Sequence, residues 1–169
     1  MRPSATLLLL AALLLPALTQ ARVLGKVRVA GIEGEPLENV RKSLSLLRLN
    51  EADRDALEEP RLAYLLRRVP AEVSRALEPY GYYEATAEVA VKRRNGTASV
   101  TITIDPGKPV RVEAVELSIQ GAADADSAVT QALAAFPLHE GEVLDHAAYD
   151  SGKLAIQRTL PSGSRRRSS

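Results

Sequence analysis

The spacing of apolar residues changes once in the middle of the chain, on either side of Gly81. Before it, apolar residues are separated by three and four positions, as on one face of a helix: Val73, Leu77 and Tyr80. After it, they are separated by two, as on one face of a strand: Ala85, Ala87, Val89 and Val91. Pro79 interrupts helical hydrogen bonding, and Gly81 can adopt the left-handed conformation that ends a helix. The pattern predicts a helix that leads directly into a strand and packs on the sheet that this strand joins.

The residues closer to the N-terminus predict a strand followed by a helix. Alternating apolar residues predict the strand over Lys26–Ala30. The segment Gly34–Pro36 is typical of a helix start, because proline and acidic residues are tolerated or favoured there. The buried stripe of this helix is predicted to be Leu37, Val40, Leu44 and Leu47. Glu38 and Lys42 lie one turn apart on its other side and are predicted to form an ion pair.

A second helix is predicted to follow a polar connection. The segment Asn50–Glu59 is polar and acidic, and we interpret it as a loop. The helix is predicted to begin near Pro60 and to keep one apolar face as far as Tyr80. A proline inside a helix costs about 3 kcal/mol and kinks the axis. Pro70 is therefore predicted to divide this helix into two bent segments that share a buried side.

The residues after Gly81 predict a β-hairpin. Strands over Glu84–Val91 and Ser99–Ile104 flank an Asn-Gly pair, which accepts the positive φ angles of a type I′ turn. The inward-facing residues of the second strand are predicted to be Val100, Ile102 and Ile104. One strand, two helices and a hairpin together predict an α+β fold in which the helices cover one face of a small sheet.

The order of elements then starts again. Val110–Ile119 is predicted to be a strand with a bulge, because its apolar spacing slips. Two helices should follow, one capped by Asp126 or Ser127 and the next by Asp145. Their apolar residues are Val129, Leu133 and Phe136 in the first, and Tyr149, Ile156 and Leu160 in the second. A second hairpin does not follow, because Pro161–Ser169 is rich in serine and arginine and has no apolar face.

The N-terminus has the three parts of a secretory signal. Arg2 gives a positive start, Ala5–Leu15 is an apolar run too short to cross a bilayer, and Ala21 completes a small-residue cleavage pattern. We expect cleavage after Ala21 and export of the rest of the chain; an uncleaved N-terminal anchor is the alternative. The expected organisation is a signal peptide (1–21), a first unit (22–106), a partial second unit that lacks two strands (107–160) and a disordered Ser/Arg tail (161–169).

Composition excludes several kinds of chemistry. The 169-residue chain has no cysteine, which excludes disulfides, thiol catalysis and thiolate metal sites. Its formal charge of +1 implies no strong attraction to nucleic acid. His139 and His146 are seven residues apart, which is not a helical ligand spacing, so we interpret them as surface loop residues rather than metal ligands. No nucleotide-binding or nucleophile motif occurs, and we expect neither enzymatic activity nor a cofactor.

Tandem strand-helix-helix-strand-strand units after a signal peptide are similar to the POTRA repeats of the outer-membrane assembly barrel superfamily. Within it, the chain resembles the first POTRA domain of the TamA family, the barrel subunits of the translocation and assembly module. The segments that carry the likeness are Val29–Ile32, Arg61–Arg68, Ala76–Tyr83 and Asp105–Val112. In that family, the helix that matches Tyr149–Leu160 leads into a hairpin, a third POTRA unit and a barrel. The resemblance therefore implies a truncated form without the barrel.

The resemblance also implies a function and a site. TamA-like POTRA repeats lie in the periplasm, where they contact the inner-membrane-anchored partner TamB and unfolded outer-membrane barrel clients. Such repeats can bind by strand addition, in which an edge strand pairs with a partner chain through main-chain hydrogen bonds. The edge implied here consists of Glu84, Ala85, Thr86, Ala87, Glu88 and Val89. Its outward residues Glu84, Thr86 and Glu88 would tolerate many partners while discouraging self-association.

Two functions of other classes stay open from the sequence. A free-standing secreted α/β binding domain, unrelated to outer-membrane assembly, would show the same pattern. A cytoplasmic nucleic-acid-binding domain would need an unprocessed signal, and the basic cluster Lys92–Arg94 has no neighbouring aromatic platform. The tyrosines of the first unit are interpreted as core and turn packing rather than a contact surface: Tyr64, Tyr80, Tyr82 and Tyr83.

Overall fold

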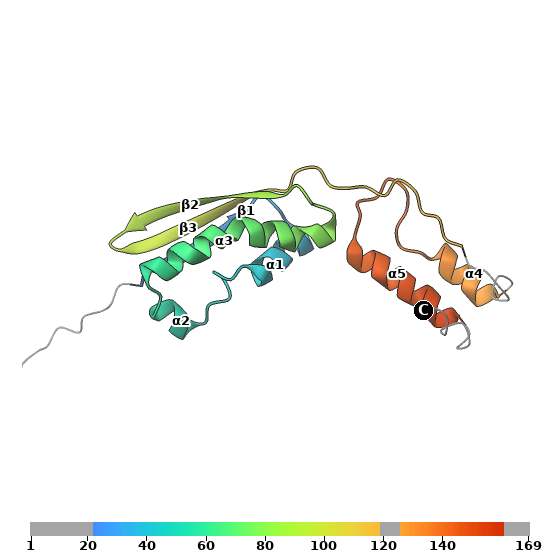
Figure 1. Ribbon diagram of the computed structural model, residues 1–169, viewed down its shortest axis with the longest axis horizontal. Coiled ribbons are helices and arrows are strands. Elements are labelled where there is room, and N and C mark those ends of the chain that lie inside the picture. The colour runs from blue at the N-terminus through green and yellow to red at the C-terminus, as the bar shows by residue number, and fades with distance from the viewer. Residues whose placement is uncertain (1–21, 119–125, 161–169) are drawn as a thin grey trace, which may run out of the picture.

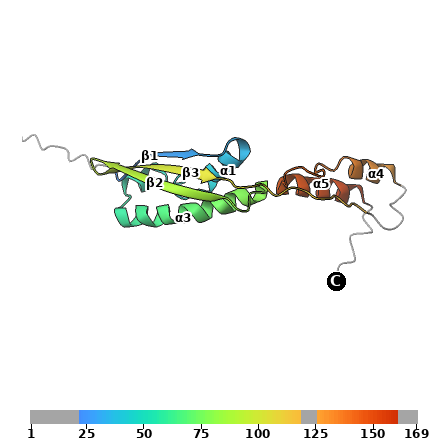
Figure 2. The same cartoon turned by 90° about the horizontal axis from the view of Figure 1, so that it is seen from above.

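The computed structural model describes residues 22–118 and 126–160 and shows the predicted α+β fold. The predicted signal peptide and the predicted tail lie outside these residues, as does Ile119. The elements of the first unit are β1 (Leu24–Ala30), α1 (Gly34–Ser43), α2 (Glu51–Asp55), α3 (Glu59–Leu77), the 3₁₀ turn η1 (Glu78–Tyr80), β2 (Thr86–Arg94) and β3 (Thr97–Asp105). The helices lie on one face of the sheet (Figure 1). The strand order is β1-β3-β2, with β3 in the centre (Figure 2).

The hairpin of β2 and β3 forms at the predicted turn. Asn95 has a φ of 50° and Gly96 a φ of 78°, so both residues of the turn adopt the positive angles that the sequence predicts. The strands are antiparallel, and their register runs from Arg94 opposite Thr97 to Thr86 opposite Asp105. β2 therefore begins two residues later than predicted. The ladder ends where Pro106, which has no N–H to donate, follows β3.

The core lies between the sheet and α3. Val100, Ile102 and Ile104 of β3 are buried, as predicted, because side chains at alternate positions of a strand share one face. The helices contribute buried residues at a spacing of three and four: Val40 and Leu44 from the α1 segment, and Leu62, Leu65, Val69, Val73 and Leu77 from α3. Gly81, with a φ of 79°, then turns the chain from η1 toward β2. This confirms the predicted transition from helix to strand.

α3 passes through Pro70 as one helix, so the prediction of two segments is wrong. Pro70 is exposed, and the carbonyl that loses its helical partner there can be hydrated. Val69 and Val73, on either side of the proline in sequence, are both buried, so the apolar face continues past it without interruption. Burial of that face outweighs the local cost of the proline, because most helical stability in proteins comes from tertiary packing.

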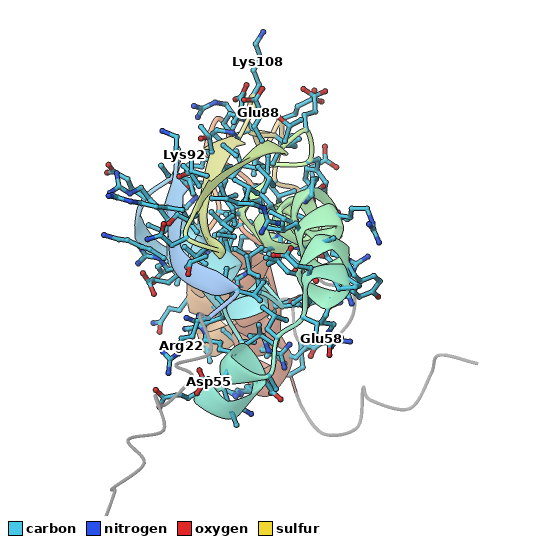
Figure 3. The ribbon with its side chains drawn as sticks, turned by 90° about the vertical axis from the view of Figure 1, so that its left-hand side faces the viewer. Arg22, Asp55, Glu58, Glu88, Lys92 and Lys108 are labelled. Atoms are coloured by element: carbon cyan, nitrogen blue, oxygen red, sulfur yellow. The ribbon has the colours of Figure 1, made fainter. Side chains whose placement is uncertain are left out.

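The predicted loop over 50–59 contains the short helix α2, which the sequence reasoning missed. Asn50 caps it, since its side chain accepts a hydrogen bond from the backbone N–H of Asp53 at 2.8 Å. Arg22 binds Asp55 at 2.6 Å and fixes α2 beside the start of β1 (Figure 3). In α1, Glu38 pairs with Arg41 at 2.7 Å rather than with Lys42, because positions three apart also lie on one face.

The second unit contains helices α4 (Ser127–Ala134) and α5 (His146–Thr159). The side chains of Asp126 and Asp145 cap them by accepting backbone N–H bonds at 2.8 and 2.9 Å, as predicted. The predicted strand after Pro109 is wrong over the described residues, since Arg111 alone forms a bridge, opposite Val143. A strand is stabilised by ladder partners, and within residues 126–160 no strand is available to pair with it.

Candidate partner-binding edges

β2 is an outer strand of the sheet, and its second edge is not paired within residues 22–118 and 126–160. Of the predicted site, residues 86–89 lie in β2, and Val89 is opposite Ile102 of β3. Glu84 and Ala85 precede the strand, and Ala85 is buried in the core. Glu88 is exposed on the face of the sheet that points away from α2 (Figure 3). The structure thus places the four later residues at an edge that can accept another strand.

The charge on β2 changes along the strand. Acidic Glu88 is at the end near η1, with Glu84 just before the strand, and basic Lys92 and Arg94 are near the hairpin turn. Arg93, between them, is held by both carboxylate oxygens of Glu59 at the start of α3, at 2.5 and 2.7 Å. These hydrogen bonds and the negative charge of Glu59 raise the pKa of Arg93. The fork geometry fixes the hairpin to the helical layer.

A buried carboxylate positions the loop after α1, and the sequence reasoning missed it. Glu72 of α3 is 7% exposed and accepts two bonds from Ser45, from the backbone N–H at 2.9 Å and from the hydroxyl at 2.6 Å. Arg68 contacts the same carboxylate at 3.0 Å. A glutamate three residues after Val69 lies on the apolar face of the helix, and this placement was the available signal. The carboxylate therefore joins α3 to the loop after α1. These two parts are too far apart in the sequence for a local pattern to predict the contact.

The two units meet at η1. The backbone N–H of Val110 donates to the carbonyl of Gly81 at 2.8 Å, and the N–H of Leu144 donates to the carbonyl of Val110 at 2.9 Å. Gly81 allows this approach, because a Cβ atom there would lie 2.7 Å from the carbonyl oxygen of Leu144. The hydroxyl of Tyr83 is 2.7 Å from Nε2 of His146, the first residue of α5. The edge of β2 therefore begins next to a joint between the units.

Some of the aromatic residues and histidines pack against the core, and others lie at the surface. Tyr82 packs against the core, as predicted, whereas Tyr64 is exposed and lies beneath the guanidinium of Arg68 at 5.7 Å. His146 is in a helix rather than a loop, so that part of the prediction is wrong. In the part of the chain that the structure describes, no cluster of His, Cys, Asp or Glu could hold a metal ion. The same residues include no helix that is long and apolar enough to cross a membrane.

Comparison with known families decides what this fold is. A family model described as "POTRA domain TamA domain 1" matches residues 26–106. This part of the chain is a POTRA domain of the TamA family. The matched residues begin at Lys26 in β1 and end immediately after β3, so they include most of β1, all of β2 and β3, and the helices that cover the sheet.

Two solved structures are similar to the chain. One is the crystal structure of Haemophilus influenzae BamA POTRA3-5, with 22% sequence identity and a TM-score of 0.35 over 79% of this chain and 50% of that chain. The other is BamA from Haemophilus ducreyi lacking POTRA domains 1-3, with 17% identity and a TM-score of 0.42 over 80% of this chain and 24% of that chain. The chain spans half or less of the length of either.

Proposed function

We propose that this chain is a periplasmic scaffold in outer-membrane protein assembly, whose POTRA domain binds extended partner chains by adding a strand to the free edge of β2. The observation that carries the proposal is the position of β2, which is hydrogen-bonded to β3 on one side only. An edge strand offers backbone donors and acceptors with little demand on partner sequence. The role is non-enzymatic and suits both an inner-membrane-anchored TamB-like partner and unfolded barrel clients.

The side chains along this edge support a sequence-tolerant contact. Thr86 and Glu88 are exposed on one face, while Ala87 and Val89 pack against the core on the other. A partner strand would pair with β2 beside the small and polar side chains of its exposed face, while the core holds the other face of β2 in place. The core would hold β2 in an extended conformation before the partner arrives, so less ordering entropy is lost on binding.

A pair of proline variants, Glu88→Pro and Val89→Pro, tests the strand addition. Backbone N–H groups alternate in direction along a strand, so one variant removes a bond to β3 and the other removes only a donor at the free edge. Thermal unfolding identifies the edge variant as the one that keeps the wild-type midpoint. We expect this variant to lose binding of a fluorescent peptide from an outer-membrane barrel strand, measured by anisotropy.

The same experiment can refute the proposal. Unchanged peptide affinity in the proline variant that remains folded would exclude main-chain pairing at β2. Because the chain has no cysteine, a single cysteine at Thr86 carrying a photo-crosslinker gives an independent readout in cells. Crosslinks to barrel proteins or to a TamB-like partner are expected at Thr86 and not at Thr103, which is exposed on the central strand.

A further inference from the structure

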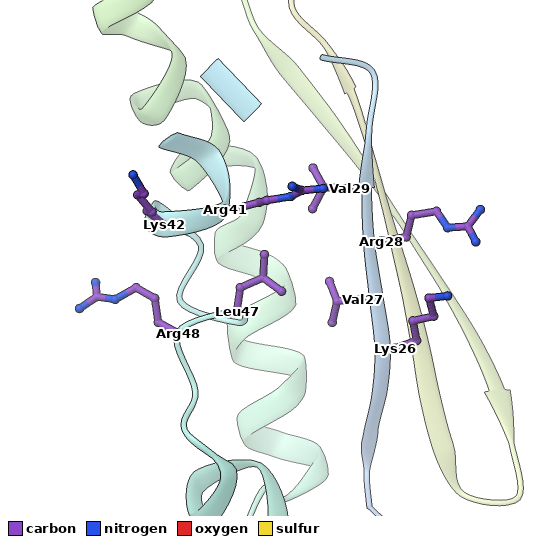
Figure 4. Close-up of a pocket in the computed structure, with 8 residues that line it drawn as sticks. All are labelled: Lys26, Val27, Arg28, Val29, Arg41, Lys42, Leu47 and Arg48. Carbon is purple, nitrogen blue, oxygen red and sulfur yellow. The ribbon is translucent and has the colours of Figure 1, made fainter. Parts of the chain in front are cut away.

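The other outer strand, β1, borders a groove of different character. A cavity of about 640 Å³ lies between β1 and the segment that contains the end of α1 and the following turn. Val27, Val29 and Leu47 form its apolar part (Figure 4). The remaining residues that line it are all cations, Lys26, Arg28, Arg41, Lys42 and Arg48, and no acidic side chain is among them. The groove therefore combines an apolar floor with a positive rim.

Most of this positive charge is not neutralised by neighbouring acids. Of the five cations, Arg41 has an ion pair, with Glu38 at 2.7 Å. Within residues 22–118 and 126–160, the other four take part in no ion pair. Cations that cluster around one part of the surface raise the local potential and attract anionic groups. The chain as a whole has a formal charge of only +1, so the groove is a local concentration of charge.

The strand beside the groove also has a free edge. β1 pairs with β3 in parallel, and its other side has no strand partner among the described residues. Figure 4 shows Val27 and Val29 pointing toward α1, while Lys26 and Arg28 project from the opposite face of β1. A strand laid along this edge would therefore place alternate side chains over the apolar floor and beside the two cations.

We propose that the β1 groove binds an acidic extended segment of a partner protein, which adds as a strand to β1. The segment has valine, leucine or isoleucine at alternate positions, to cover Val27 and Val29, and aspartate or glutamate between them, opposite Lys26 and Arg28. The unpaired main-chain groups of β1 favour a peptide over an isolated phosphate or lipid headgroup, which would use the cations alone. This site is separate from the β2 edge, because β3 lies between the two strands.

The test uses the full chain and a short peptide in which valine and glutamate alternate, with a valine-lysine peptide for comparison. We expect the glutamate peptide to bind and to slow amide exchange in residues 24–30. The double variant Lys26→Glu with Arg28→Glu should weaken binding at least about tenfold, because two opposite-charge contacts become like-charge contacts. The same variant should gain affinity for the lysine peptide. Lys92→Glu with Arg94→Glu, an equal charge change on β2, is the matched control and should retain binding.

Three outcomes would overturn this proposal. Equal weakening in the β2 control would show non-specific attraction to net charge. Exchange protection in residues 86–94 instead of 24–30 would assign the peptide to β2. Full competition by inorganic phosphate, or tighter binding to anionic phospholipid vesicles without protection of β1, would show an anion or headgroup site rather than strand addition. The β2 proline variant that keeps the wild-type midpoint leaves β1 unchanged, so failure at β1 and failure at β2 can be distinguished.

Discussion

In the first unit, α1 and α3 pack against each other and α3 packs against the sheet, whereas in the second unit α4 and α5 pack mainly against each other. The helical residues Val40, Leu62 and Leu77 of the first unit are fully buried. In α5 of the second unit, Tyr149 is 48% exposed and Leu154 is 50% exposed. The helices of both units have the apolar spacing typical of helices, and those of the second unit also have side-chain caps. This difference shows that a helical pattern specifies a helix, whereas packing on a sheet determines how much of the helix's apolar face is buried.

The residues after Pro109 show the same contrast between the units, here for a strand instead of helices. β1 of the first unit pairs with β3 and buries Leu24, while Val115 and Leu117 of the second unit are 36% and 37% exposed. An extended segment without a neighbour leaves its backbone groups to water and contributes little apolar burial. We therefore treat the first unit as the main source of stability in the described chain.

The largest expected effect comes from Ile102→Ala. Ile102 is fully buried in the central strand, and truncation of such a side chain costs about 2–5 kcal/mol, from lost transfer free energy and the cavity left behind. Urea unfolding followed by circular dichroism should show the loss in the main transition. Phe136→Ala in the second unit, which removes a buried ring, should leave this transition within about 0.5 kcal/mol of the wild type.

The two variants together test whether the two units differ in their contribution to stability. If Phe136→Ala lowers the main transition as much as Ile102→Ala does, the two units unfold as one cooperative structure. Thr103→Ala is the matched control for β3, since its side chain is exposed on the other face of the same strand. A large loss in this control would assign the effect to β-propensity rather than to the core.

A smaller effect is expected where the units meet, from Gly81→Ala. Gly81 has a φ of 79°, and an added Cβ would contact the carbonyl oxygen of Leu144. Gly96→Ala is a close control, because Gly96 has a φ of 78° and nothing within 4 Å of an added Cβ. Both should lose about 1–2 kcal/mol from backbone strain. Gly81→Ala should lose more and should also speed amide exchange in α5, whereas equal losses would show that the joint adds no stability.

Local chemistry explains which parts of the fold could be predicted from the sequence. The turn at Asn95 and Gly96 and the caps at Asp126 and Asp145 form from neighbouring residues, and all of them were predicted. The short helix α2 could also have been found, since Asn50 is a preferred cap, but the acidic composition of the segment favoured a loop. In each case the deciding interaction spans no more than a few residues.

Interactions between distant residues could not be predicted in this way. Glu72 is buried because Ser45, 27 residues away, provides its hydrogen bonds. The strand predicted after Pro109 failed because a strand also requires a neighbour. In the candidate sites, the edge at residues 86–89 followed from the family resemblance. The β1 groove did not, because Val27 and Leu47, which are far apart in the sequence, are brought to one cavity only by the tertiary fold.

The smallest expected effect is that of Tyr83→Phe at the joint. The variant removes the hydroxyl that lies 2.7 Å from Nε2 of His146 and retains the ring. Tyr83 is 44% exposed, so water replaces most of the lost bond, and about 0.5 kcal/mol is expected. Amide exchange in the first turn of α5 should report it better than global unfolding. His146→Ala should produce the same local change, and the double variant should add nothing further if the two side chains act as one pair. Additive changes would show that each residue stabilises its own unit and that the hydrogen bond does not couple them.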